Sequence, residues 1–169
     1  MFLHKLVFDY FQYTRFQALE KQGNLKSGLL DLDGIKLHFY ESQNEQRPIL
    51  FLHGLLDASF GFRKIIPYLD KKHKIYLFDL PSFGKSKLPK IKFLYQIDYF
   101  ANLIYEGIQK LNLKNLTICG HSMGGLVSQH LALLDSEKRI EKLILLAPGN
   151  SPHPERDRMR SILFPKAIE

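Results

Sequence analysis

Short apolar runs alternate along this chain with longer segments of helical periodicity, and this alternation limits the fold more than any other feature. Each run is brief and nearly continuous, which is typical of a strand covered on both faces. The predicted strands are Pro48–Leu52, Lys74–Asp79, Leu116–Cys119 and Lys142–Leu146. The predicted helices between them are Ala58–Leu69, Tyr95–Leu111 and Met123–Leu134. This order indicates an α/β fold with a mostly parallel sheet and helices on both faces.

An antiparallel hairpin is expected to precede these elements. Leu29–Asp33 and Ile35–Tyr40 alternate with period two, and they flank Asp33-Gly34, a dipeptide that tolerates positive φ at both positions. The hairpin and the later strands together predict a sheet of about six strands. The chain has 169 residues and no internal repeat, so we expect one globular domain.

Composition excludes several classes of protein. The chain is 45% apolar and 24% charged, which is typical of a globular protein with a core. Cys119 is its one cysteine, so neither an internal disulfide nor a cysteine-based zinc site is available. The formal net charge is +7, but the basic residues are spread over predicted loops and helix ends. They form no nucleic-acid-binding motif, and we expect no nucleic-acid partner.

The first residues form an amphipathic segment with two open interpretations. Apolar residues of the segment 1–16 fall near helical spacing, while Lys5 and Asp9 interrupt any signal-peptide core. The segment is either a helix packed on the domain or an interfacial anchor that makes peripheral membrane contact. No apolar run is long enough to cross a bilayer. We expect a cytoplasmic protein, with membrane association as the alternative.

The strongest chemical signal is Gly120-His121-Ser122-Met123-Gly124, which lies between a predicted strand and a predicted helix. At such a junction the chain reverses so sharply that the serine backbone is strained, and the flanking glycines avoid collisions. The alternative is a surface turn in which Ser122 merely caps the helix. His53-Gly54 and the loop Asp79–Ser86 each follow a predicted strand directly. The carboxyl ends of strands are where open α/β sheets place their ligand sites.

These motifs resemble the α/β-hydrolase superfamily, in its branch of esterases, lipases and peptidase-like enzymes with a serine nucleophile. The resemblance covers the chain from about Leu29 to about Pro148. It implies Ser122 as the nucleophile and an oxyanion hole formed by the backbone N–H groups of Leu55 and Met123. It implies no metal and no organic cofactor. One departure is Ser82, which stands where the family's loop usually carries glycine.

A complete catalytic triad is not expected within this sequence. A serine hydroxyl needs a histidine base oriented by a carboxylate, and in this family both follow the serine on loops after later strands. Too few residues follow Ser122 to hold those strands and the usual lid. Neither His121 nor His130 is placed to act as the base, and the resemblance gives His53 a role in supporting its turn. The remaining pair, His153 and Asp157, lies in a segment that we expect at the protein surface.

The predicted organisation is therefore an amphipathic segment at 1–26, the amino-terminal part of a hydrolase core at 27–150, and the start of a lid or tail at 151–169. The predicted function is a serine hydrolase of small ester or acyl substrates. The alternative is an inactive, truncated hydrolase that acts at most as a binding module. In that case another chain would pair with the unprotected strand edge at Leu146.

Overall fold

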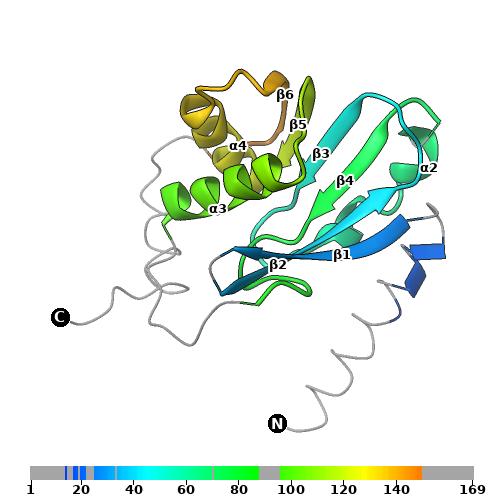
Figure 1. Ribbon diagram of the computed structural model, residues 1–169. Coiled ribbons are helices and arrows are strands. Elements are labelled where there is room, and N and C mark those ends of the chain that lie inside the picture. The colour runs from blue at the N-terminus through cyan, green and yellow to red at the C-terminus, as the bar shows by residue number, and fades with distance from the viewer. Residues whose placement is uncertain are drawn as a thin grey trace, which may run out of the picture.

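A single mixed β-sheet with helices on both faces forms the centre of the protein (Figure 1). The computed structural model describes residues 14, 17, 18, 20, 21, 25–32, 34–69, 71–87 and 96–149. The six strands lie in the order β1-β2-β4-β3-β5-β6. Their bounds are β1 Leu25–Leu32, β2 Ile35–Ser42, β3 Pro48–Leu52, β4 Lys74–Phe78, β5 Leu116–His121 and β6 Ile140–Leu146. The helical elements are η1 Ser59–Phe62, α2 Ile66–Leu69, α3 Ile97–Lys110 and α4 Met123–Leu134.

The predicted hairpin is confirmed, and both of its strands are longer than the sequence pattern indicated. β1 and β2 are antiparallel, with Leu32 paired to Ile35 across the turn. Gly34 has a φ of +87°, a conformation in which glycine pays no Cβ penalty, and its N–H donates to Asp31 Oδ1 over 2.9 Å. Asp33 itself lies outside the described residues.

The rest of the sheet is mostly parallel, as predicted. β4 pairs antiparallel with β2, whereas the pairs β3–β4, β3–β5 and β5–β6 are all parallel. In a parallel sheet the loops that follow the strands gather at one end of the sheet, where the carboxyl ends of the strands lie. His53-Gly54 after β3, Asp79 after β4 and Ser122 after β5 therefore share the same end of the sheet.

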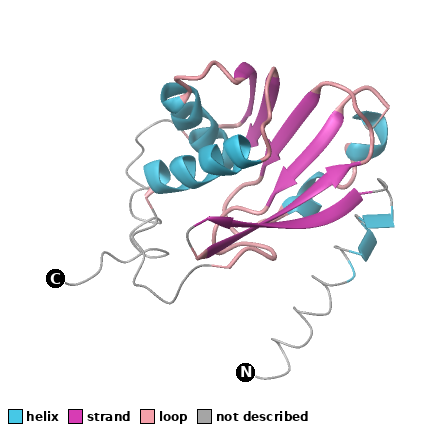
Figure 2. Cartoon of the chain, viewed as in Figure 1, coloured by secondary structure: helices cyan, strands magenta, loops and turns pink. Residues whose placement is uncertain are grey.

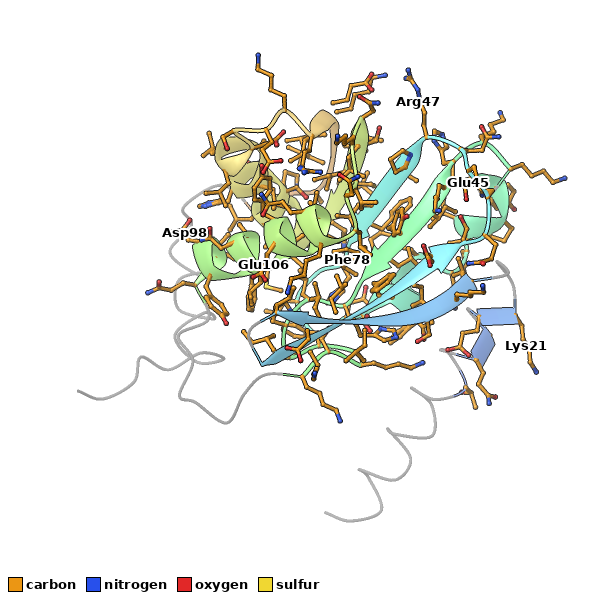
Figure 3. The ribbon with its side chains drawn as sticks, viewed as in Figure 1. Lys21, Glu45, Arg47, Phe78, Asp98 and Glu106 are labelled. Carbon is orange, nitrogen blue, oxygen red and sulfur yellow. The ribbon has the colours of Figure 1, made fainter. Side chains whose placement is uncertain are left out.

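Two apolar cores, one on each face of the sheet, confirm the predicted layers. Figure 2 shows the helices that cover the sheet. On one face Leu50 and Phe78 pack with residues of α3 and α4, and Phe78 lies beneath α3 (Figure 3). On the opposite face Phe51 packs with residues of η1 and α2, including Ile66. Successive residues of β3 thus point into different cores, which explains why the whole strand is apolar.

The one marked departure concerns Ala58–Leu69, which was expected to form a single helix. The structure instead has the short helical turn η1, a turn at 63–65, and the four-residue helix α2. Pro67 explains the break, because it lacks the N–H that a continuous helix would donate to the carbonyl of Arg63. The other predicted helices and strands are confirmed, with described ends that match or are displaced by one or two residues, except that β1 begins four residues earlier than predicted.

Several predictions fall on residues outside the described part. They are the amphipathic segment 1–16, apart from Thr14, and the segment 151–169 that was assigned to a lid or tail. The boundaries proposed at 26/27 and 150/151 stay predictions, although residues 26 and 27 themselves are described and lie in β1. Within the described residues, no helix has the length and apolar character that a membrane span requires.

Candidate active site

Ser122 occupies a strained hinge between β5 and α4. Its φ of 53° and ψ of −114° lie outside the regions that a non-glycine residue normally adopts, at a cost of about 1–3 kcal/mol. Its side chain makes no capping hydrogen bond to α4. The alternative in which Ser122 is an ordinary capping serine is therefore wrong. The strain holds a half-buried hydroxyl at the carboxyl end of the sheet.

Backbone hydrogen bonds from β6 and the loop after it hold this hinge in place. The Ser122 N–H donates to the carbonyl of Leu146 over 3.0 Å. The Ser122 carbonyl accepts from the N–H groups of Gly125 and Gly149, each over 3.0 Å. The conformation of the hinge therefore depends on the last described strand as well as on its own sequence.

The positions around Ser122 require glycine, because other atoms approach them too closely to leave room for a Cβ atom. A Cβ atom on Gly124 would lie 2.1 Å from the Leu52 carbonyl oxygen, and one on Gly120 would lie 2.5 Å from that of Gly124. A Cβ on Gly54 would lie 3.2 Å from the Ser122 Cβ. The turn after β3 therefore packs directly against the hinge, and Leu55 follows at once.

Two backbone N–H groups near the hinge are available to a ligand. Among the described residues, no acceptor takes a hydrogen bond from the N–H of Leu55 or of Met123. Met123 is the first residue of α4, where amide groups lack helical partners and the helix dipole is positive. Both groups suit the binding of a developing oxyanion, and the assignment of that role to them stays a prediction.

The sequence also matches a known protein family. The model of the alpha/beta hydrolase fold family matches residues 47–167. The chain belongs to this family. It is 35% identical over 119 residues to the uncharacterized hydrolase YugF of Bacillus subtilis, covering 70% of this chain and 43% of that protein. It is 37% identical over 102 residues to a Drosophila melanogaster protein named "Probable serine hydrolase", covering 59% of this chain and 30% of that one.

Solved structures show the same fold. The haloalkane dehalogenase DatA from Agrobacterium tumefaciens superposes with a TM-score of 0.69 at 22% identity, covering 81% of this chain and 48% of that one. At this identity the likeness speaks for the fold alone. The chain spans less than half the length of each of these three proteins.

In this α/β-hydrolase chain, His53 supports its turn and has no free nitrogen for catalysis. Its Nδ1 donates to the Gly54 carbonyl over 2.8 Å, and its Nε2 accepts from the Leu80 N–H over 2.9 Å. The side chain is fully buried, and burial lowers the pKa of His53, which favours the neutral ring. A neutral ring with both nitrogens bonded links the loop after β3 to the loop after β4.

The buried carboxylate of Asp79 likewise holds its loop in place through hydrogen bonds. Its carboxylate accepts hydrogen bonds from Ser59 Oγ (2.6 Å), the Ser59 N–H (2.8 Å), the Lys85 N–H (2.9 Å) and His38 Nδ1 (2.9 Å). Burial alone would raise the pKa of Asp79, but these bonds, with His38 first, lower it below the usual value of 3.8. Asp79 is therefore ionised and fully bonded, and it is not available as the acid of a triad at Ser122.

Sequence reasoning did not find His38. The imidazole is buried in β2, and its Nε2 lies 2.8 Å from Ser27 Oγ, so Ser27, His38 and Asp79 form a hydrogen-bonded chain. His38 and Asp79 lie far apart in the sequence, and the pairing of β2 with β4 brings them together, whereas the β1–β2 hairpin places Ser27 near His38. A histidine inside an apolar strand was the only local signal.

Ser82, the departure from the family pattern, keeps the loop shape that glycine would give. Its φ is +72°, in the left-handed region that glycine enters without penalty. Gly84, two residues later, also has a positive φ of +55°, and a Cβ there would lie 2.3 Å from the Asp79 carboxyl carbon. The loop therefore retains its path around Asp79 and accepts local strain at Ser82.

None of the other candidate bases among the described residues bonds to Ser122. His121 Nδ1 would lie 3.2 Å from a Cβ atom added to Gly54, so it is near the hinge. No hydrogen bond joins it to Ser122. His130, on α4, pairs with the exposed Asp98 of α3 over 2.5 Å. His153 and Asp157 lie outside the described residues. Within the described part, the site consists of a strained serine and two free amide groups.

Proposed function

We propose that this chain carries the nucleophile and the oxyanion hole of a serine hydrolase that acts on small ester or acyl substrates. The observation that supports this most strongly is the strained backbone of Ser122, whose hydroxyl caps nothing and whose Cβ lies against the Gly54 turn. Strain of this kind persists only where the surrounding structure enforces it. The backbone bonds from Leu146 and Gly149 do so here.

The proposed reaction forms an acyl-enzyme at Ser122. Its Oγ attacks the substrate carbonyl carbon, and the hydroxyl proton passes to a base. The carbonyl oxygen becomes an oxyanion that accepts hydrogen bonds from the Leu55 and Met123 N–H groups. The tetrahedral intermediate then expels the alcohol, which takes up the proton, and water later releases the acid by the same route.

The residue at the hinge supports acyl chemistry over the other reactions of this fold. Haloalkane and epoxide hydrolysis in the superfamily use an aspartate where Ser122 stands. Matching relatives have names that include hydrolases, serine hydrolases and a haloalkane dehalogenase. A serine at that position favours the serine hydrolases among them.

Labelling with a fluorophosphonate tests the proposal on the chain alone. We expect slow formation of a covalent adduct at Ser122 at mildly alkaline pH, located by peptide mass spectrometry. The adduct should be absent from Ser122→Ala and retained in Ser136→Ala, whose side chain is exposed in the turn after α4. A folded chain that forms no adduct at Ser122 under these conditions contradicts the proposal.

A second candidate is a binding module without catalysis. It is favoured by the finding that no histidine among the described residues bonds to Ser122. An isolated oxyanion hole retains about 10³–10⁴-fold acceleration over water. Hydrolysis of p-nitrophenyl acetate equal in the wild type and in Ser122→Ala, together with no adduct, would support this candidate.

A further inference from the structure

A serine on the edge strand β1 takes part in the hydrogen-bonded chain that ends at Asp79. Ser27 Oγ lies 2.8 Å from His38 Nε2, and His38 Nδ1 lies 2.9 Å from Asp79 Oδ2. A hydroxyl, an imidazole and a carboxylate joined in this order form the arrangement that activates a serine for attack on a carbonyl. Ser27 is exposed, whereas His38 and Asp79 are buried. Of the three groups, the hydroxyl is therefore the one that a ligand can meet.

The charge of Asp79 sets the direction of the hydrogen bond at Ser27. An ionised carboxylate can only accept hydrogen bonds, so His38 Nδ1 carries a proton and donates it to Asp79. In the neutral ring, Nε2 is then the acceptor, and the Ser27 hydroxyl donates to it. His38 is thus placed to take the proton of the Ser27 hydroxyl.

The position of His38 is fixed on several sides. Its N–H donates to Ser86 Oγ over 2.8 Å, and its carbonyl accepts the Asp79 N–H over 3.0 Å. Its ring meets the Tyr40 ring edge-on, with 4.7 Å between the two ring centroids. A base held in this way needs no rearrangement before it accepts a proton, which is what efficient proton transfer requires.

This chain of side chains is separate from the hinge at Ser122. Ser27 and Cys119 lie in one row across the sheet, which runs through Tyr40, Leu77 and Phe51. Four strand spacings of about 4.8 Å each put Ser27 about 19 Å from Cys119, and Ser122 lies beyond Cys119 at the end of β5. A carbonyl group bound at one serine is therefore out of reach of the other.

We propose that Ser27 is a second nucleophile of this chain, which takes an acyl group from an activated ester with His38 as its base. Ser27 Oγ attacks the carbonyl carbon, and the hydroxyl proton passes to His38 Nε2. The tetrahedral intermediate expels the alcohol, which takes the proton from His38, and an ester of Ser27 remains. His38 is 2% exposed, so water reaches Nε2 poorly once Ser27 is acylated. We expect a lasting modification of Ser27 rather than rapid turnover.

Acetylation by p-nitrophenyl acetate tests the proposal in the full chain carrying Ser122→Ala, with the sites located by peptide mass spectrometry. We expect Ser27 to be acetylated about 100-fold faster than Ser136, an exposed serine to which no histidine of the described part bonds. His38→Asn, when circular dichroism shows it to be folded, should lower the rate at Ser27 to that at Ser136. Equal rates at the two serines before this substitution, or an unchanged rate at Ser27 after it, overturn the proposal.

A matched pair of cysteine variants tests the base without any change to His38. Ser27→Cys and Ser136→Cys each introduce a thiol at an exposed position, while the native Cys119 is buried. A thiol beside an imidazole ionises more readily, so iodoacetamide should alkylate position 27 about tenfold faster than position 136 at neutral pH. Equal alkylation of the two variants also overturns the proposal.

The outcome does not depend on the function proposed for Ser122. Acetylation at Ser27 in a chain whose Ser122 never forms a fluorophosphonate adduct would confirm the second nucleophile and contradict the hydrolase function. An adduct at Ser122 together with equal acetylation of Ser27 and Ser136 would do the reverse.

Discussion

His38 Nδ1 donates a 2.9 Å hydrogen bond to the carboxylate of Asp79, and both side chains are excluded from solvent. This contact joins β2, in the amino-terminal hairpin, to the loop that follows β4. The same carboxylate bonds to Ser59 and to the Lys85 N–H, so four donors converge on one buried charge. We therefore expect Asp79 to contribute to stability rather than to catalysis.

Replacing Asp79 with asparagine should lower the free energy of unfolding by about 3–5 kcal/mol, because it removes the charge that these buried donors face. Urea denaturation followed by circular dichroism measures the change. Asp98→Asn is the matched control, since its carboxylate pairs with His130 at an exposed site where 75% of the Asp98 side chain is accessible. A loss of stability in Asp98→Asn equal to that in Asp79→Asn would contradict this assignment.

The same carboxylate predicts the acid dependence of stability. Its pKa in the folded chain lies below the ordinary value of 3.8, so ionised Asp79 stabilises the fold at pH values above that range. The contribution should disappear as the pH falls through the lowered folded-state pKa. Unfolding measured from pH 6 down to pH 2 should show a steeper acid loss in the wild type than in Asp79→Asn. Parallel curves would count against the lowered pKa.

The local conformation of Ser82 gives a prediction of the opposite sign. Ser82→Gly should raise the free energy of unfolding by about 0.5–1 kcal/mol, because glycine adopts its φ of +72° without steric cost. The matched control is Ser136→Gly, at a turn residue that is not among the positive-φ positions, which should be neutral or slightly destabilising. Thermal unfolding of the three proteins side by side decides this. A decrease for Ser82→Gly would mean that the side chain stabilises the loop by more than its strain costs.

Elements defined by local pattern could be predicted from the sequence. Pro48–Leu52 was predicted with its observed bounds, because a short apolar run between polar segments has few alternatives to a buried strand. The strained turn at Ser122 was predicted from two glycines at fixed spacing. The single long helix at Ala58–Leu69 was wrong, since apolar periodicity was given more weight than the missing N–H of Pro67.

What depends on pairing between distant strands could not be predicted. The bonding of His38 to Asp79 follows from the register of β2 against β4, which no local pattern specifies. The support of Ser122 by Leu146 and Gly149 likewise requires β6 to lie beside β5. Sequence reasoning thus found the strained turn at Ser122 but not the contacts that hold it.

Cys119 should be unreactive in the folded protein. It is buried in β5 beside the hinge, and burial raises the pKa of its thiol to about 11. At pH 8 the thiolate is therefore scarce as well as shielded. Ellman's reagent should report almost no reaction of the native chain and one thiol after addition of guanidinium chloride. Rapid native reaction would place Cys119 at the surface.

Gly124 provides the sharpest test of the hinge. An alanine Cβ there would lie 2.1 Å from the Leu52 carbonyl oxygen, so either β3 or the start of α4 must move. Because Met123 and Ser122 directly precede this residue, we expect Gly124→Ala to reduce fluorophosphonate labelling of Ser122 by about 100-fold or more, the size of effect that loss of one oxyanion-hole donor produces. Leu133→Ala, at a highly exposed position on the same helix, should label at the wild-type rate. Circular dichroism of both variants separates a displaced hinge from general unfolding, and normal labelling of folded Gly124→Ala would show that the hinge tolerates the shift.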